Sequence, residues 1–468
     1  MPDTLAPRLA LARAAGALSR LRGGGGTSMP GKVLMRLAPG AIGALGARLA
    51  RGSVLISATN GKTTTARMAA AVLQRAGVEV IHNQAGANMA GGIASTLLAA
   101  ARPHGAIAGE LGLFEVDEMW LAPLAAELHS GTILLGNLFR DQLDRYGELE
   151  AIAERWQQTL AHAGAQLVLN ADDPLVADLG REQPGALYFG IDDDSLALEG
   201  LAHAVDAKHC RRCGAPYVFD AVYMGHLGHY HCANCGQRRP EPSVRATEVT
   251  LEGVRAARFT LHTPAGSGVV ELALPGLYNV YNAVGAAALA TALEVPLAHI
   301  LDGLAASRAA FGRAESVTLE LPRGAGSAPV RRELRILLVK NPAGANEVLR
   351  TLALEPGEHD VLAVLNDNIA DGRDVSWIWD ADFELLAGRV RRITCSGSRA
   401  EELALRMKYA GVEPARIELQ GDLAAALEEA AADRAQDDAP LYALPTYTAM
   451  LALRDLLVAR GEARSSWA

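Results

Sequence analysis

The sequence is poor in cysteine, has no long apolar run and carries no excess of positive charge. Its 468 residues include only five cysteines, too few for a disulfide scaffold. No run of about 18 apolar residues is present, so we expect no transmembrane helix. Lys and Arg number 44 against 53 Asp and Glu, a net charge of −9. Because proteins that coat nucleic acid need a basic surface, we expect no nucleic acid partner.

The N-terminal segment, residues 5–22, lacks the uninterrupted apolar stretch of a signal peptide, because arginines break it repeatedly. We therefore expect a cytoplasmic protein. Two interpretations of this segment stay open. The one that we favour is a capping helix with a solvated arginine face. The other is an amphipathic helix that makes peripheral contact with the inner face of an anionic membrane.

Short apolar runs alternate with helical stretches along most of the chain. Hydrophobic residues make up 50% and charged residues 21%, as in globular enzymes. The alternation predicts an α/β protein with a parallel sheet, followed by a second, smaller α/β unit after a loose segment at 322–330. The expected strands lie at 54–57, 78–81, 106–108, 132–135 and 166–169, and in the second unit at 335–339, 361–365 and 392–395.

A phosphate-binding loop follows the first predicted strand. The segment SATNGKTTT places Gly-Lys-Thr between that strand and a long helical stretch. Backbone N–H groups at such a helix start bind phosphate oxygens, so Lys62 would reach the β- and γ-phosphates of ATP and the Thr63 hydroxyl would bind Mg²⁺. Ile56 replaces the first glycine of the full pattern. The weaker alternative is an ordinary helix N-cap at Thr59 or Asn60.

Charged residues follow two further apolar runs. Glu115, Asp117 and Glu118 lie in FEVDE, and residues 137–148 hold several charged side chains around Gln142. Because the strand ends of an open α/β sheet converge on one crevice, such carboxylates suit a Mg²⁺ site near the phosphate loop. A solvated turn explains the first group equally well, and the start of an amphipathic helix explains the second.

Four of the five cysteines form two C-x-x-C pairs, Cys210 with Cys213 and Cys232 with Cys235, separated by an 18-residue spacer. This spacing is typical of a zinc ribbon, in which each pair supplies two thiolates to a tetrahedral Zn²⁺. Four protein ligands leave no open position, so the predicted zinc site is structural. The alternatives are a redox pair and unligated thiols.

Four motifs in one order resemble those of the Mur ligase superfamily. They are TNGKTTT, LNADD (169–173), LPGLYNVYNAVGAAA (274–288) with its two asparagines, and FGRAE (311–315). The cysteine-rich insert, FRDQLDRYGE, VKNPAGANEVL (339–349) and NDNIADGRDVSWIWDADFE (366–384) resemble one branch of that superfamily, whose members are the ligase-like subunit of an amidating enzyme. The resemblance covers about residues 30–460.

The resemblance implies a Mur ligase-type central ATPase domain with a parallel-rich sheet and an inserted zinc ribbon, followed by a smaller Rossmann-like α/β C-terminal domain. We accordingly divide the chain into four parts. These are an N-terminal helical segment (1–50), a central ATP-binding domain (51–318), a zinc-ribbon insert within it (205–242), and a C-terminal α/β domain (330–468).

The resemblance also implies an ATP-dependent ligase. Members of this branch amidate the α-carboxylate of D-glutamate in the peptidoglycan stem peptide of lipid II, through an acyl phosphate, and so form D-isoglutamine. A GatD-like glutaminase supplies the ammonia, and the two subunits form a heterodimer. The alternative is a stand-alone ligase of the Mur or folylpolyglutamate type that adds an amino acid. The intact Lys62–Thr63 pair argues against a non-enzymatic interaction protein.

Motif by motif, the resemblance assigns residues to roles. Lys62 and Glu115 would act in catalysis, with Thr63 and Glu115 as ligands of Mg²⁺. Asp374, in GRDVSW, would orient the catalytic His of the glutaminase across the subunit interface, as an Asp does in a catalytic triad. The residues expected to bind the nucleotide are Thr59, Asn60, Gly61, Lys62, Thr63, Thr64, Asn279, Asn282 and Arg313.

Four departures from the superfamily pattern qualify these assignments. Gln142 stands where the ligases usually have a His that binds a second metal ion, and Ala58 replaces the usual Gly before TNGKT. Residues 149–161 contain no Lys to match the carbamylated Lys of many of the ligases. Only about 55 residues precede the phosphate loop, too few for a domain that binds a nucleotide sugar, which favours a lipid-linked acceptor.

Overall fold

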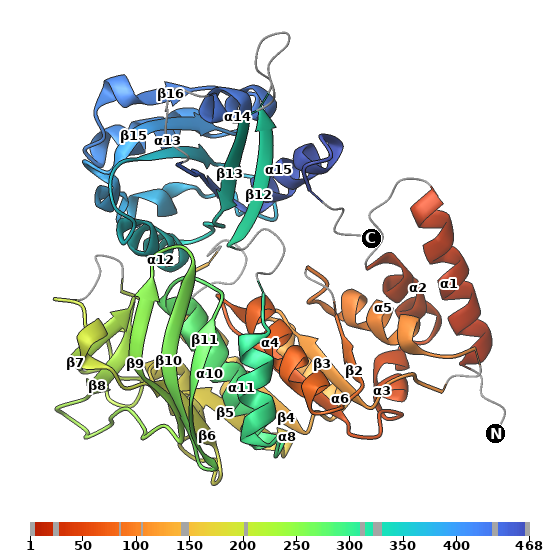
Figure 1. The fold of residues 1–468 in the computed structure, drawn as a ribbon. Helices are drawn as coiled ribbons and strands as arrows, with labels where there is room; N and C mark the ends of the chain where they lie inside the picture. The colour runs from red at the N-terminus through yellow and green to blue at the C-terminus, as the bar shows by residue number, and fades with distance from the viewer. Residues whose placement is uncertain are drawn as a thin grey trace.

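The computed structural model describes residues 5–21, 28–83, 86–103, 106–141, 149–200, 205–308, 314–321, 330–432 and 439–463. Two α/β units lie one above the other in Figure 1, and the upper one begins with β12 at Glu315. Among the described residues, no helix combines the length and the apolar character needed to cross a bilayer.

The lower unit is built on a nine-stranded sheet. Seven neighbouring strands pair in parallel and the last two, at one edge, are antiparallel. In spatial order the strands are β2 (Val80–His82), β3 (Leu111–Glu115), β1 (Ser53–Ser57), β4 (Thr132–Leu135), β5 (Gln166–Asn170), β6 (Leu187–Ile191), β9 (Val244–Glu252), β10 (Ala256–Thr263) and β11 (Gly266–Leu272). Val54 and Ile56 pack into one core and Leu55 into the other, so both faces of β1 are buried.

Helices cover both faces of this sheet. One face carries α4 (Lys62–Arg75), α10 (Leu277–Ala292) and α11 (Leu297–Ala305). The other carries α5 (Ala90–Ala100), α6 (Leu121–Leu128), α8 (Leu149–Ala163) and the short α9 (Pro174–Ala177). The N-terminal helices α1 (Ala6–Leu21), α2 (Met29–Leu37) and α3 (Ala41–Gly46) join the same core beside α5, at the right of Figure 1.

The upper unit is a six-stranded sheet with two core clusters of its own. Only the edge pair β12–β13 is antiparallel. In spatial order the strands are β12 (Glu315–Leu321), β13 (Val330–Ile336), β17 (Leu441–Pro445), β14 (His359–Val364), β15 (Val390–Ser396) and β16 (Ile417–Leu419). The helices are α12 (Pro342–Ala353), α13 (Ala400–Tyr409), α14 (Leu423–Ala431) and α15 (Tyr447–Ala459). The predicted α/β class, with a parallel-rich sheet and a smaller second unit, is confirmed.

A separate hairpin of β7 (Val218–Met224) and β8 (Leu227–His231) stands between β6 and β9 in the chain, where the zinc ribbon was predicted. The remaining elements are single 3₁₀ turns: η1 (Asp178–Gly180), η2 (Asp194–Leu196), η3 (Ser376–Trp379), η4 (Phe383–Leu386) and η5 (Pro414–Arg416).

The strand expected at 106–108 is wrong. Those residues contribute only an isolated bridge between Ala101 and Ile107, and the strand of the sheet is β3, three residues further on. Gly109 lies between the two runs with φ 132°, which residues with a side chain rarely adopt, so the chain turns there and β3 starts afresh. The strand expected at 335–339 begins earlier, at Val330.

Candidate active site

The phosphate loop connects β1 to α4 and is fixed by close contacts. Gly61 has φ 84°, and a Cβ there would lie 2.0 Å from Asn282 Oδ1, so only glycine fits. Asn137, two residues after β4, accepts a hydrogen bond from the backbone N–H of Asn60 at 2.9 Å and donates one to the carbonyl oxygen of Asn60 at 3.0 Å. The loop shape is therefore set by residues from α10 and from the end of β4.

Lys62 is the first residue of α4 and its side chain is buried. Its Nζ donates to the carbonyl oxygen of Ala58 at 2.8 Å and pairs with Glu118 Oε2 at 3.1 Å. Burial by itself lowers the pKa of Lys62, but the nearby carboxylates of Glu118, Glu115 and Asp117 outweigh it and raise the pKa above its usual value. Lys62 therefore stays positively charged inside the site.

Two oxygen atoms beside this lysine, Thr63 Oγ1 and Glu115 Oε2, are buried and have no hydrogen-bond partner among the residues that the structure describes. Asn83 fixes the second residue, because its side chain bonds both the N–H of Glu115 (2.8 Å) and its carbonyl oxygen (2.9 Å). Leaving such oxygens unpaired costs about 1–3 kcal/mol each. A hydroxyl and a carboxylate oxygen are ligands that Mg²⁺ prefers, so these two residues fit the predicted ion.

A cavity of about 270 Å³ lies over the phosphate loop, between the two units. Leu337, Lys340 and Glu347 line it from the upper unit. The predicted nucleotide-binding or catalytic residues among its lining are Thr59, Asn60, Gly61, Lys62, Thr64, Glu115, Asn279 and Asn282. Thr63 lies in the first turn of α4 beneath the loop and is buried. Arg313 and Gln142 lie outside the described residues.

The two asparagines predicted on α10 form a chain of hydrogen bonds with the phosphate-loop helix. Thr65 Oγ1 donates to Asn282 Oδ1 at 3.2 Å, and Asn282 Nδ2 donates to Asn279 Oδ1 at 3.2 Å. Asn279 in turn donates to the carbonyl oxygen of Pro275 at 2.8 Å. Both amide side chains are buried and oriented by these bonds at the cavity wall.

The upper unit contacts the phosphate loop directly. Asn60 and Asn341 exchange side-chain hydrogen bonds of 3.1 and 3.0 Å. Next to them, Lys340 Nζ pairs with Asp141 Oδ2 at 2.5 Å. Asn341 also caps α12, accepting from the N–H of Gly344 at 2.9 Å. Polar contacts therefore join the two units beside the cavity.

Sequence reasoning missed four of these residues: Asn83, Asn137, Lys340 and Asn341. Asn83 and Asn137 follow the apolar runs of β2 and β4, at the strand ends where polar residues converge. Asn341 precedes Pro342, which is the signature of a helix N-cap with proline at the first position. These signals were present in the sequence, but they did not identify which loop each residue contacts.

Asp374 lies apart from the cavity. It is exposed, in the segment between β14 and η3, and its carboxylate accepts a hydrogen bond from the N–H of Ser376 at 2.9 Å. Hydrogen bonds from the Ser376 side chain and backbone lower the pKa of Asp374 below its usual value. The residue is thus an ionised carboxylate facing solvent, and it does not contact the phosphate loop.

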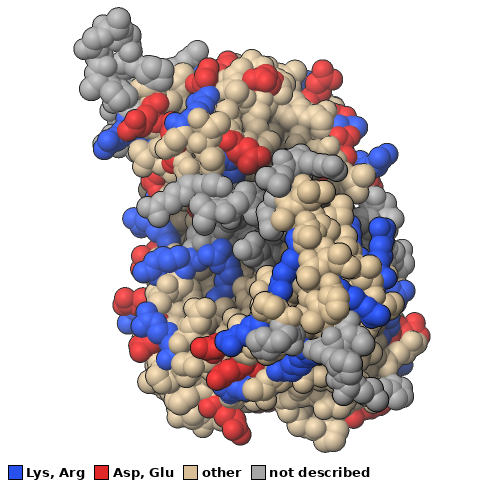
Figure 2. All heavy atoms as spheres, turned by 90° about the vertical axis from the view of Figure 1, so that its right-hand side faces the viewer, with Lys and Arg blue, Asp and Glu red and all other residues tan. Residues whose placement is uncertain are grey.

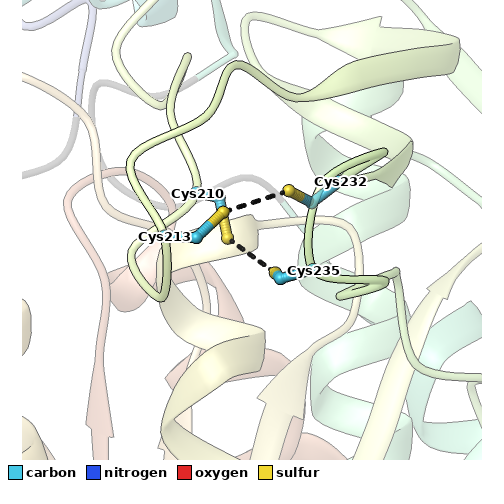
Figure 3. A group of neighbouring side chains, drawn as sticks. All are labelled: Cys210, Cys213, Cys232 and Cys235. Atoms are coloured by element: carbon cyan, nitrogen blue, oxygen red, sulfur yellow. Dashed lines mark hydrogen bonds between the residues drawn. The ribbon is translucent and has the colours of Figure 1, made fainter.

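The four predicted zinc ligands come together in the hairpin region (Figure 3). Their sulfur atoms all lie within 4.8 Å of one another. Cys210 and Cys235 are 3.6 Å apart and Cys213 and Cys232 are 3.5 Å apart. Each pair sits in a tight turn that ends on a glycine with φ 74°. Four thiols at this spacing fit a tetrahedral Zn²⁺.

The LNADD motif ties this cysteine region to the sheet. Asp172, fully buried, accepts hydrogen bonds from Arg239 Nε (2.6 Å), Tyr281 Oη (2.7 Å) and the N–H of Ile191 (2.9 Å). Arg239 follows the second cysteine pair, Tyr281 is on α10 and Ile191 ends β6. One carboxylate thus joins three separate parts of the central unit.

Comparison with known proteins places this architecture among the Mur ligases. The Mur ligase middle domain model matches residues 56–290. The fold is similar to that of a pseudomurein peptide ligase type C from Methanothermus fervidus, with a TM-score of 0.64 and 24% identity over 87% of this chain and 78% of that one. The predicted Mur ligase-type fold is therefore confirmed.

The comparison also identifies the branch. The MurT ligase C-terminal model matches residues 338–450. The chain is 33% identical over 404 residues to the "lipid II isoglutaminyl synthase (glutamine-hydrolyzing) subunit MurT" of Staphylococcus aureus strain N315, covering 86% of this chain and 87% of that one. It is 31% identical over 445 residues to the protein of that name from Streptococcus pneumoniae strain R6, covering 95% and 94%. The chain belongs to the MurT family.

Proposed function

We propose that this chain is the ligase-like subunit of a lipid II isoglutaminyl synthase. It uses ATP to amidate the α-carboxylate of D-glutamate in the stem peptide of lipid II, giving D-isoglutamine. The main observation that supports this proposal is the cavity that Lys62, Glu115 and Asn282 line together with residues of the upper unit. The relatives that share most of the length of this chain carry the corresponding name.

The chemistry follows from the weak electrophilicity of a carboxylate. A carboxylate oxygen attacks the γ-phosphorus of ATP while the bond from that phosphorus to the ADP oxygen breaks. Ammonia then attacks the carbonyl carbon, the carbon–oxygen bond to phosphate breaks, and the nitrogen loses one proton. The charge of Lys62 stabilises the phosphoryl group in transfer. The Asn60–Asn341 contact holds the upper unit over the phosphate loop, where it limits the access of water to the acyl phosphate.

Thr63 and Glu115 are the residues that would hold Mg²⁺, because each has a buried oxygen beside the phosphate loop without a partner among the described residues. When bound, the ion supplies positive charge to the transferring phosphoryl group. Thr59, Asn60, Gly61, Thr64, Asn279, Asn282 and Arg313 complete the proposed nucleotide site. The four converging cysteines would hold a structural Zn²⁺ with no role in the reaction.

The proposed partner is a GatD-like glutaminase that supplies ammonia and forms a heterodimer with this chain. Asp374 would orient the catalytic His of that subunit. Two observations support this role: the carboxylate is exposed and ionised, and it lies outside the ATP cavity.

Because the reaction consumes ATP, we propose that it takes place in the cytoplasm. The domain limits 1–50, 51–318 with the insert 205–242, and 330–468 remain our working division.

Incubation of the purified chain with ATP, Mg²⁺, ammonium and lipid II tests the proposal. Mass spectrometry should show one carboxylate converted to a carboxamide, with release of ADP and phosphate. Lys62→Ala, as the matched control, should give no product while keeping the wild-type circular dichroism spectrum. No change with ammonium, but a product enlarged by an amino acid when amino acids are offered, would instead establish the stand-alone ligase.

A further inference from the structure

Positive charge is concentrated at the start of the chain. The first 50 residues hold seven Lys and Arg and a single acidic residue, Asp3, whereas the other 418 hold 37 Lys and Arg and 52 Asp and Glu. After Asp3 the next acidic residue is Glu79. A strongly basic surface on an otherwise acidic protein points to an anionic partner.

The first helix has two different faces. Leu5, Leu9 and Ala12 are buried against the rest of the protein. On the opposite side Leu11 is 59% exposed and Leu18 is 54% exposed. The exposed apolar side chains therefore repeat at a spacing of two helical turns on the outward face.

This helix is held in place, so its outward face is part of the folded structure. Arg13 donates to the carbonyl oxygens of Leu98 and Ala101 at the end of α5. A Cβ at Gly16 would lie 2.6 Å from Pro30 Cγ, which shows how closely α1 packs on α2. Because the helix is already packed on its inner side, the outward leucines are not part of the protein's own core.

The second helix packs on the first and carries further exposed basic and apolar residues. Lys32 and Arg36 are exposed, and so are Met29 (49%) and Leu37 (38%). Figure 2, which views this side of the molecule, shows an uncharged band bordered on both sides by Lys and Arg. We call this surface, made by Arg8, Leu11, Leu18, Met29, Lys32, Arg36 and Leu37, the basic face.

We propose that the basic face binds a phospholipid bilayer that contains anionic lipid. Single exposed leucines are common and need no explanation. An apolar band between basic side chains is different, because the band enters the acyl boundary while the long basic chains reach the headgroups. The structure thus favours the membrane interpretation of the N-terminal segment over a solvated capping helix.

The basic face is connected to the cavity by one helix. Gly31 of α2 packs on α5, where its N–H donates to Ser95 Oγ at 2.8 Å. Asn88 and Met89, which line the cavity, directly precede the first residue of α5. A bilayer on the basic face would therefore touch helices that pack on α5, whose N-terminal end borders the cavity. Bilayer binding itself does not depend on that function, since it needs neither ATP nor acceptor.

Vesicle sedimentation of the full chain, without ATP or acceptor, tests the charge component. Wild type should bind phosphatidylcholine vesicles that contain phosphatidylglycerol, bind phosphatidylcholine alone weakly, and lose binding as salt rises. Each basic residue near an anionic surface changes binding about fivefold, so Lys32→Glu/Arg36→Glu should weaken it by about 25-fold or more. Arg258→Glu/Lys408→Glu makes the same charge change at exposed positions elsewhere and should leave binding nearly unchanged.

A second pair of variants tests the apolar component. Leu11→Gln/Leu18→Gln should weaken binding even at low salt, whereas Leu405→Gln/Leu419→Gln, at 48% and 54% exposed positions, should not. All four sites are exposed, so the melting temperature should stay at the wild-type value. The proposal is overturned if the wild-type protein does not bind anionic vesicles, or if the control variants and the basic-face variants lose vesicle binding equally. It is also overturned if the basic-face variants lose the glutaminase subunit while vesicle binding persists.

Discussion

Two threonines of α4 give the sharpest test of the site, because the same substitution should have opposite effects on stability. Thr63 and Thr65 are both buried. Within the described part of the chain Thr63 Oγ1 has no hydrogen-bond partner, whereas Thr65 Oγ1 donates to Asn282 Oδ1 at 3.2 Å. Valine replaces each hydroxyl with a methyl group of similar size, so the comparison isolates the hydroxyl.

The expected magnitudes follow from these contacts. A buried hydroxyl without a partner costs about 1–3 kcal/mol, so Thr63→Val should raise the free energy of unfolding of the nucleotide-free protein by about 1 kcal/mol. Thr65→Val loses a hydrogen bond and leaves Asn282 Oδ1 without this donor, so it should lower that free energy by about 1 kcal/mol. Each change corresponds to a shift of about 2–4 °C in melting temperature for a domain of this size.

The assay is thermal unfolding with and without Mg²⁺ and a non-hydrolysable ATP analogue. Ligand binding raises the melting temperature of wild type by mass action. Thr63→Val should lose most of this increase and all amidating activity, although it is the more stable protein without nucleotide. The reasoning is refuted if Thr63→Val is less stable than wild type without nucleotide, or if it keeps the full increase with Mg²⁺ and the analogue.

Three further predictions concern other parts of the molecule. Asp374→Ala should reduce glutamine-dependent amidation far more than ammonium-dependent amidation in the two-subunit enzyme; equal loss with both nitrogen sources would place Asp374 in the ATP site instead. Cys210→Ser should remove bound zinc, measured by atomic emission, and make the insert sensitive to proteases; a protein that retains its zinc would exclude a four-cysteine site. Asp172→Ala removes one of the two carboxylates that pair with Arg239, and it takes the acceptor from the Tyr281 hydroxyl and the N–H of Ile191, so it should lower the free energy of unfolding of the central unit in urea by about 3 kcal/mol; a loss below about 1 kcal/mol would show that this carboxylate is not the link between insert and sheet.

Local patterns were enough to predict most of the architecture. The phosphate loop, the cysteine pairs and the strands at 132–135 and 166–169 are continuous segments whose residues specify their own conformation. The strand at 106–108 was misplaced because periodicity does not show where a glycine such as Gly109 takes a positive φ. The register and the end points of a strand depend on the strands that pair with it, and a local sequence pattern does not identify those strands.

Local sequence patterns could not predict the long-range contacts that assemble the site. Asn60 meets Asn341 across 281 residues of sequence, and Asn137 meets Asn60 across 77. Their partners depend on how the sheets are ordered and how the two units dock. Asp172 shows the same limit, since LNADD was recognised as a motif while its role as a link to Arg239 and Tyr281 emerged only from the fold.

If the four cysteines hold zinc, as we propose, the position of the insert makes metal supply a condition of assembly. β6 and β9 are parallel neighbours, and parallel neighbours need a crossover connection that in most α/β proteins is a helix. Here the chain between Ile191 and Val244 makes that crossover through the cysteine hairpin. If zinc folds the hairpin, as we propose, a cell short of zinc would produce chains in which β9, β10, β11 and the asparagine-bearing α10 add slowly to an already formed half-sheet. The amount of newly made protein that binds nucleotide would then depend on zinc availability, even though none of the four cysteines lines the cavity.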